Sequence, residues 1–255
     1  MKAKIDGRKL GLLGYPLGHS FSKKWFEDKF RREGLEGWGY LLLERSNLEG
    51  LKQEIANDSE WLGFNVTVPH KQNILRFLDS VDSLAARIQA VNVVKVMKDG
   101  SWRGFNSDYE GFMQTLLNWL PAHGWKGRSA FILGNGGAAG AVSAVLQDLG
   151  VDARMVARRP GPDQILWENL SVEQCRQKDL VVHCTPLGMW PDTEEIPPIP
   201  DFCFRAGQFV VDLIYNPPKT RLLDAAASCG AITANGSLML EKQAEKAWKI
   251  WIDSD

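Results

Sequence analysis

Apolar, strand-like runs alternate with amphipathic, helix-like stretches along almost the whole chain, and this alternation constrains the fold more than any other feature. A repeated strand–helix order favours a mainly parallel sheet covered by helices on both faces. In the first part of the chain we expect strands at 9–17, 38–44 and 63–69, helices at 22–32 and 48–56, a helical stretch after the third strand, and a hairpin at 91–106. Asn47 is the candidate N-cap of the second helix, and Asp99-Gly100 is the expected hairpin turn.

A second strand–helix series follows a predicted helix at 109–120. The expected strands are 131–134, 153–158, 180–186, 209–215 and 231–236, with helices ending at 149 and spanning 220–228 and 238–251. We therefore predict an α/β chain with one domain at 1–106 and a second at 107–236. No strand follows the last helix, so we expect 237–255 to return to the first domain and complete it.

The amino-acid composition argues against several kinds of binding partner. The 255 residues are 44% hydrophobic and 24% charged, with a net charge of −1, ordinary values for a globular protein with a core. A balanced charge gives no reason to expect nucleic acid or an anionic membrane as a partner. Neither a charged-then-apolar leader nor a long apolar stretch is visible, so we expect a cytoplasmic protein. The spacing of the four cysteines and four histidines predicts reduced thiols and no metal site.

A glycine-rich turn, FILGNGGAAG at 131–140, lies between a predicted strand and a predicted helix. Gly134, Gly136, Gly137 and Ala138 fall within a G-x-G-x-x-G/A pattern, which lets the backbone approach a pyrophosphate at a helix N-terminus. On the glycines alone, a packing corner between strand and helix explains the pattern equally well.

Two arginines follow the next strand, in VARRP. NAD-binding proteins place an acidic residue near this position to bind the ribose 2′-hydroxyl, whereas Arg158 and Arg159 suit a 2′-phosphate. The pair favours NADP as cofactor, the alternative being two solvated surface arginines.

Polar residues also follow the strands of the first domain, where open α/β sheets bind their ligands. Ser20 and Ser22 can hold a carboxylate near a helix N-terminus, although Ser22 also suits an N-cap. Asn65 and Thr67 share one face of a buried strand and need polar partners, which makes a ligand plausible there.

Lys71, Asn92 and the group Asn106-Ser107-Asp108 add charges and amides to this region. Lys71 by itself reads as a surface lysine, and Asp108 by itself reads as the N-cap of the helix that follows.

Eight motifs together resemble the shikimate dehydrogenase family, nearly end to end and in the family's order. They are GYPLGHSFS, GFNVTVPHK, AVNVV, GFNSD, GNGGAAGA, CTPLGM, DLIYNPPKT and NGSLMLEKQA. The resemblance implies an N-terminal substrate domain, a Rossmann-type NADP domain and a C-terminal helix that returns to the first domain.

The resemblance also implies roles for matching residues. Lys71 and Asp108 match the catalytic pair. The implied substrate contacts are Ser20, Ser22 and Thr67 for the carboxylate and ring, Asn65, Asn92 and Gln243 for the hydroxyls, and Tyr215 near the carboxylate. The implied cofactor contacts are Gly134, Gly136, Gly137 and Ala138 at the pyrophosphate, Arg158 at the adenosine phosphate with Arg159 adding charge, and Thr185, Met189 and Gly236 at the nicotinamide.

The implied reaction is the reversible NADPH-dependent reduction of 3-dehydroshikimate to shikimate in aromatic amino acid biosynthesis. Three alternatives stay open: a quinate/shikimate dehydrogenase using NAD, a paralogue acting on a related metabolite, and a non-catalytic NADP-binding protein. We expect a small-molecule substrate, no nucleic acid or membrane partner, and a monomer or homodimer.

Overall fold

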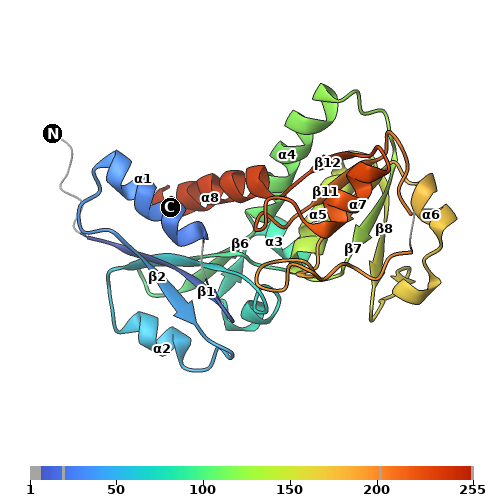
Figure 1. Cartoon of the computed structure of the whole chain (residues 1–255). Helices are drawn as coiled ribbons and strands as arrows, with labels where there is room; N and C mark the ends of the chain where they lie inside the picture. The colour runs from blue at the N-terminus through green and yellow to red at the C-terminus, as the bar shows by residue number, and fades with distance from the viewer. Residues whose placement is uncertain (1–6, 19–20, 201–202, 254–255) are drawn as a thin grey trace. The chain divides into compact units, whose positions relative to one another are not determined.

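The computed structural model describes residues 7–18, 21–200 and 203–253. The chain divides into two compact units, one formed by Met1–Ser107 with Ala244–Asp255 and the other by Asp108–Gln243. Each unit contains a six-stranded sheet (Figure 1). The α/β class expected from the sequence is confirmed.

The first sheet is mixed, with strand order β2-β1-β3-β5-β6-β4. Its parallel part comprises β1 (Lys9–Gly14), β2 (Gly39–Glu44) and β3 (Trp61–Val66). The expected hairpin forms from β5 (Val93–Val96) and β6 (Trp102–Phe105), which extend the sheet in antiparallel pairing. The short strand β4 (Ser80–Val81) lies at the edge, parallel to β6.

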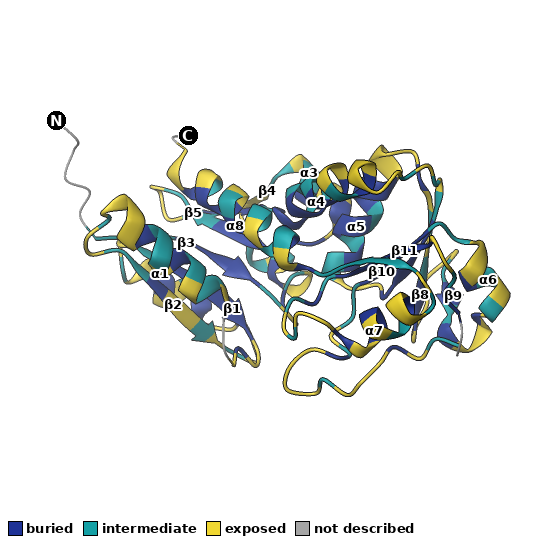
Figure 2. Ribbon diagram, turned by 45° about the horizontal axis from the view of Figure 1, so that its top comes forward, coloured by how far each residue is buried: buried dark blue, intermediate teal, exposed yellow. Residues whose placement is uncertain are grey.

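Two apolar clusters cover the faces of this sheet. One includes α2 (Leu51–Ala56), α3 (Ser83–Ile88) and the 3-10 turn η1 (Asn73–Phe77). The other includes α1 (Phe21–Glu33) and the end of α8 (Ser237–Ile252). Figure 2 shows how α1 divides into a buried and an exposed face, as its amphipathic sequence predicts.

The start of α2 differs from the sequence-based expectation. The N-cap of α2 is Gly50 in the left-handed region, at φ 73°, so the helix begins at Leu51 and Asn47 does not cap it. The Asn47 side chain instead accepts a hydrogen bond from the Glu49 backbone N–H. The helical stretch expected after the third strand forms as η1 and α3, and the N-cap of α3, Asp82, accepts hydrogen bonds from two backbone N–H groups.

The second sheet is entirely parallel, with strand order β12-β11-β10-β7-β8-β9. Its strands are β7 (Ser129–Leu133), β8 (Asp152–Ala157), β9 (Ile165–Leu166), β10 (Leu180–His183), β11 (Phe209–Asp212) and β12 (Ile232–Ala234). The strand order reverses between β7 and β10. In open α/β sheets such a switch point opens a crevice at the carboxyl ends of the strands, where ligands bind.

Helices cover both faces of the second sheet. Helices α4 (Asp108–Ala122) and α5 (Gly137–Asp148), with Met239 of α8, pack on one face. The other face is covered by α7 (Arg221–Ser228), α6 (Val172–Gln177) and the 3-10 turn η2 (Trp167–Asn169). The sequence analysis missed α6, although Ser171 and Gln174 form a reciprocal capping box at its start.

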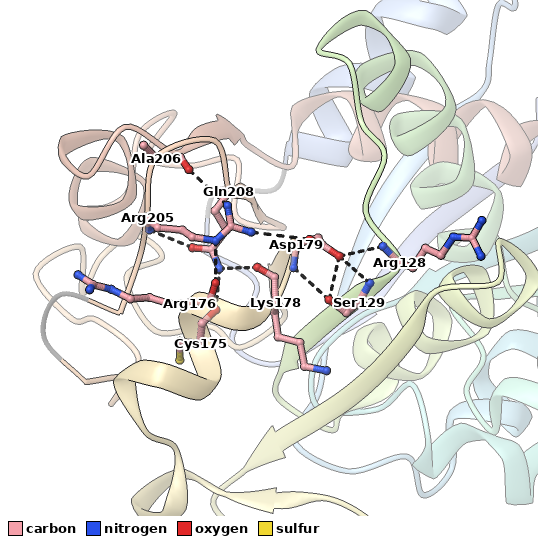
Figure 3. A network of polar contacts seen from close by, with 9 residues as sticks. All are labelled: Arg128, Ser129, Cys175, Arg176, Lys178, Asp179, Arg205, Ala206 and Gln208. Atoms are coloured by element: carbon pink, nitrogen blue, oxygen red, sulfur yellow. Dashed lines mark hydrogen bonds and ion pairs between the residues drawn. The ribbon is translucent and has the colours of Figure 1, made fainter.

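A polar network fastens the amino ends of the parallel strands (Figure 3). The Asp179 carboxylate accepts hydrogen bonds from the backbone N–H groups of Arg128 and Ser129, at 2.9 and 3.1 Å, and from the Ser129 hydroxyl. The buried Gln208 amide donates to the carbonyls of Cys175 and Lys178. These residues lie at the edge opposite the switch-point crevice, so we regard the network as structural.

Candidate active site

The glycine turn has the backbone geometry that a bound pyrophosphate requires. Gly134 follows β7 at φ 118°, a conformation that favours glycine, and a side chain there would contact Thr185. Gly136 is the N-cap of α5 and provides no capping side chain, and a Cβ placed on it would meet open space. Gly137 and Ala138 begin the helix. The turn therefore fits a dinucleotide: it leaves room for phosphate oxygens at a helix N-terminus.

The loop that carries the arginine pair is fastened to the glycine turn. The Asn135 side-chain amide donates to the Arg159 carbonyl and to Gln164 Oε1, both at 3.0 Å. Gln164 Oε1 also accepts from the Gly161 backbone N–H at 2.9 Å. The side chains of Arg158 and Arg159 are exposed just beyond β8. The turn and the arginine loop therefore form one connected structure.

Sequence reasoning missed Asn135 and Gln164. Asn135 occupies a variable position of the glycine pattern, and its contact with Gln164 depends on the parallel pairing of β8 with β7 and β9. No local signal in the sequence indicates that contact.

A buried polar relay lies at the carboxyl ends of β10 and β11, beside the switch point. His183 and Asp212 are fully buried and stand opposite each other in the pairing of the two strands. Their side chains are 3.0 Å apart, from Nδ1 to Oδ1, and His183 Nε2 lies 2.5 Å from the Thr185 hydroxyl. The Thr220 hydroxyl donates to Asp212 Oδ2 at 2.6 Å. Of these residues, the sequence analysis named Thr185 alone, although a His and an Asp each end a buried apolar strand.

The remaining residues expected at the nicotinamide lie on loops and strand ends of the same unit. Met189 is 43% exposed on the loop after β10. Gly236 follows β12, and a Cβ there would collide with the backbone of Leu213, so the position requires glycine. Tyr215, which the resemblance places near the substrate carboxylate, follows β11, and burial raises the pKa of its phenol, which therefore keeps its proton near neutral pH.

A cluster of amides in the first unit is held by the protein itself. The Asn65 carbonyl oxygen accepts from the Tyr40 hydroxyl at 2.8 Å, and its amide donates to the Asn92 carbonyl at 3.2 Å. The Asn92 side chain donates to the Ser107 hydroxyl at 3.0 Å and accepts from the Ser107 backbone N–H at 2.6 Å. The buried polar groups thus find partners in the chain, and Asn92 fixes the backbone just before Asp108.

Lys71 and Asp108 belong to different units, so their pairing stays a prediction. Lys71 is partly buried, and its carbonyl accepts from the Val91 backbone N–H at 2.8 Å. Asp108 is 5% exposed and is the first residue of α4. The N-cap interpretation of Asp108 is therefore wrong, because the residue lies inside the first helical turn.

The other predicted substrate residues are placed as follows. Thr67 comes directly after β3, and its backbone N–H donates to the Leu13 carbonyl. Ser22 is the second residue of α1, so it does not cap that helix. Gln243 lies on α8, where its amide donates to the Leu240 carbonyl. Ser20 lies outside the described residues.

Among the described residues, no helix is long and apolar enough to cross a bilayer. Within the same residues, no group of three or more His, Cys, Asp or Glu side chains forms a potential metal site.

A parallel sheet with a dinucleotide-type turn, a basic loop after its second strand and a separate mixed-sheet unit defines a two-domain α/β dehydrogenase with a Rossmann-type domain. The family model described as the shikimate dehydrogenase substrate binding domain matches residues 12–94. A curated relative from Moorella thermoacetica, named shikimate dehydrogenase (NADP(+)), is 36% identical and aligns over 98% of this chain and 90% of its own length. The chain belongs to the shikimate dehydrogenase family, as the sequence motifs predict.

Solved structures agree with this assignment. Shikimate 5-dehydrogenase from Thermus thermophilus, in complex with NADP(H) and shikimate, is 31% identical with a TM-score of 0.82, covering 96% of this chain and 93% of its own. Quinate dehydrogenase from Corynebacterium glutamicum, in complex with NAD, is 27% identical with a TM-score of 0.81, covering 97% and 94%. Both structures match nearly the whole of this chain, so the predicted two-domain α/β fold is confirmed.

Proposed function

We propose that this chain catalyses the reversible NADPH-dependent reduction of 3-dehydroshikimate to shikimate, a step in aromatic amino acid biosynthesis. Membership of the shikimate dehydrogenase family over nearly the full chain carries this proposal. The enzyme class is that of an NADP-dependent oxidoreductase acting on a CH–OH group. The fastened arginine loop agrees with NADP, because two exposed guanidinium groups follow the second strand of the Rossmann-type unit.

In this proposal, the first unit binds the substrate and the second binds the cofactor, which supplies or accepts the hydride when bound. Lys71 donates a hydrogen bond or proton to the oxygen on which negative charge develops, and Asp108 holds Lys71 and a substrate hydroxyl. Asn65, Asn92 and Gln243 bind hydroxyls, whereas Ser20, Ser22, Thr67 and the protonated Tyr215 phenol bind the carboxylate and ring.

The internal bonds of the amide cluster support these roles. Tyr40 and Ser107 orient the Asn65 and Asn92 side chains before any ligand arrives, so binding orders fewer groups. A small-molecule substrate, a cytoplasmic location and a monomeric or homodimeric state complete the proposal.

Initial rates test the reaction. We expect the wild type to reduce NADP⁺ with shikimate, and we expect Lys71→Ala to lower kcat by about 10²–10⁴-fold, the usual contribution of a general acid–base group. The Kd for NADP⁺ should stay unchanged in this variant. Lys98→Ala, at an exposed turn lysine, is the matched control and should retain wild-type rates.

A quinate dehydrogenase using NAD is the second candidate, because the NAD-bound quinate dehydrogenase structure matches nearly the whole chain. Equal rates with quinate and NAD⁺ would favour it over the first candidate. Tight NADP⁺ binding without turnover of either substrate would instead indicate a paralogue with another substrate or a non-catalytic binding protein.

A further inference from the structure

The relay at the ends of β10 and β11 has a defined direction of hydrogen bonding. Asp212 accepts from the Thr220 hydroxyl at Oδ2, at 2.6 Å, and from the Ile214 backbone N–H at Oδ1, at 3.0 Å. Both carboxylate oxygens are thus acceptors, and the remaining neighbour, His183 Nδ1, must donate to Oδ1. The His183 ring therefore donates from Nδ1, and in the tautomer that carries its one proton there, Nε2 is an acceptor.

The state of His183 determines what Thr185 offers to a ligand. A hydroxyl has one donor and two acceptor lone pairs. The Thr185 O–H donates to His183 Nε2 at 2.5 Å, and its oxygen accepts from the Leu187 backbone N–H at 3.3 Å. One lone pair remains on this partly exposed side chain. Thr185 therefore presents an acceptor, and its ligand partner must be an N–H or O–H donor.

The position of Thr185 limits which donors of NADP can reach it. Its methyl group lies beside Gly134, the first glycine of the turn, at the β10 side of the switch point. The arginine loop follows β8, on the other side of β7, so the adenosine end of a dinucleotide belongs there. On the β10 side, bound NADP would offer two kinds of donor, the hydroxyls of the nicotinamide ribose and the amino group of the nicotinamide carboxamide. We take the carboxamide as the partner of Thr185, and a cofactor that lacks this amino group separates it from the ribose hydroxyls.

We propose that the buried Asp212–His183 pair fixes the Thr185 hydroxyl as an acceptor for the carboxamide N–H of bound NADP, which makes His183 a positioning residue for the nicotinamide. This inference rests on the proposed function only in that it takes NADP as the ligand. It adds two residues, His183 and Asp212, and a direction of hydrogen bonding to the cofactor site. A fixed carboxamide sets which face of the ring meets the substrate.

Binding of two cofactors tests the contact directly. The probes are NADP⁺ and its 3-acetylpyridine analogue, in which a methyl group replaces the carboxamide NH₂, and Kd is measured by calorimetry without substrate. We expect the wild type to bind the analogue about tenfold more weakly, as for loss of one hydrogen bond. Thr185→Val should weaken NADP⁺ binding about tenfold and leave analogue binding unchanged, while Thr185→Ser should restore the wild-type preference.

Thr115→Val is the matched control, because its buried hydroxyl bonds within its own helix to the Gly111 carbonyl. It should keep the wild-type ratio of the two Kd values. Equal weakening of both cofactors in Thr185→Val, or no weakening of either, would overturn the contact with the carboxamide.

The role of His183 has a readout that needs no variant. In the cofactor-free protein, ¹⁵N NMR of the ring should show a neutral imidazole protonated at Nδ1 at pH 7. A proton on Nε2, or a charged ring, would overturn the relay. His183→Gln should also reduce the preference for NADP⁺ over the analogue. Shikimate turnover by the wild type is measured separately, so failure of the proposed reaction is distinguishable from failure of this contact.

Discussion

At the scale of single residues, cofactor choice depends on side chains that need not touch the cofactor. Gln164 receives hydrogen bonds from Asn135 and from the Gly161 backbone, and so holds the arginine loop against the glycine turn. We expect Gln164→Ala to raise the Kd for NADP⁺ by about three- to tenfold, the range of one or two hydrogen bonds. The Kd for NAD⁺ should change little, because NAD⁺ has no 2′-phosphate for the arginines to bind.

Calorimetric titration with both cofactors measures this effect, and Gln147→Ala, an exposed change on α5, serves as control. If Gln164→Ala weakens NADP⁺ and NAD⁺ equally, the loop supports the turn as a whole and does not determine specificity.

Residue types near the site could be predicted, but their partners could not. Asn65 and Asn92 stand out as amides inside apolar runs, and both lie in the buried cluster. Tyr40, which donates to Asn65, lies 25 positions away and becomes its neighbour through the pairing of β1 with β2 and β3. Such contacts depend on strand order, and a linear pattern of apolar residues does not encode strand order.

At the scale of elements, Asp179 connects the start of β10 to the start of β7 (Figure 3). Burial raises the pKa of its carboxyl, but hydrogen bonds from Arg128 and Ser129 outweigh burial and hold the pKa below the ordinary value of 3.8. Since the carboxylate is partly exposed, we expect Asp179→Asn to lower the free energy of unfolding by about 1–2 kcal/mol at pH 7.

The stability lost in Asp179→Asn should decrease as the pH falls. A carboxyl whose pKa is lower in the folded state stabilises the fold above its unfolded pKa and loses that effect as pH falls through the folded pKa. Urea denaturation should therefore give a constant difference in the free energy of unfolding between wild type and Asp179→Asn from pH 7 to 5, and this difference should decrease below pH 3.8. Asp192→Asn, at an exposed loop residue, should have the same free energy of unfolding as the wild type. A difference for Asp179→Asn that persists undiminished into acid would contradict an electrostatic origin.

Long elements were predictable, and short ones were not. The hairpin of β5 and β6 and the long helices α1, α4 and α8 follow from turn residues and apolar periodicity. The two-residue strands β4 and β9 contain too few residues to show a period, and tertiary pairing alone defines them. Pro121 directly follows the helix predicted at 109–120, but it lies within the last turn of α4.

At the scale of the whole molecule, the C-terminal end of α8, from Ala244, belongs to a unit whose other residues are N-terminal. Trp251 of α8 is 3% exposed, donates from Nε1 to the Val94 carbonyl at 2.9 Å, and packs on Phe26 with ring centroids 5.5 Å apart. A Cβ at Gly63, which has φ 156°, would collide with the Trp251 ring. The sheet of the first unit is therefore shaped around this side chain.

We expect Trp251→Ala to destabilise the first unit by about 3–5 kcal/mol, as for other buried tryptophans, because it leaves a cavity and removes the indole hydrogen bond to the Val94 carbonyl of β5. Ile252→Ala on the same helix should cost less than about 0.5 kcal/mol, because Ile252 is 47% exposed. Native-state hydrogen exchange should show the loss of protection in β1, β3 and β5, with β7 and β10 retaining theirs. Equal loss in both sheets would mean that the units unfold together, so that the C-terminal helix stabilises the chain as one cooperative structure and not the first unit alone.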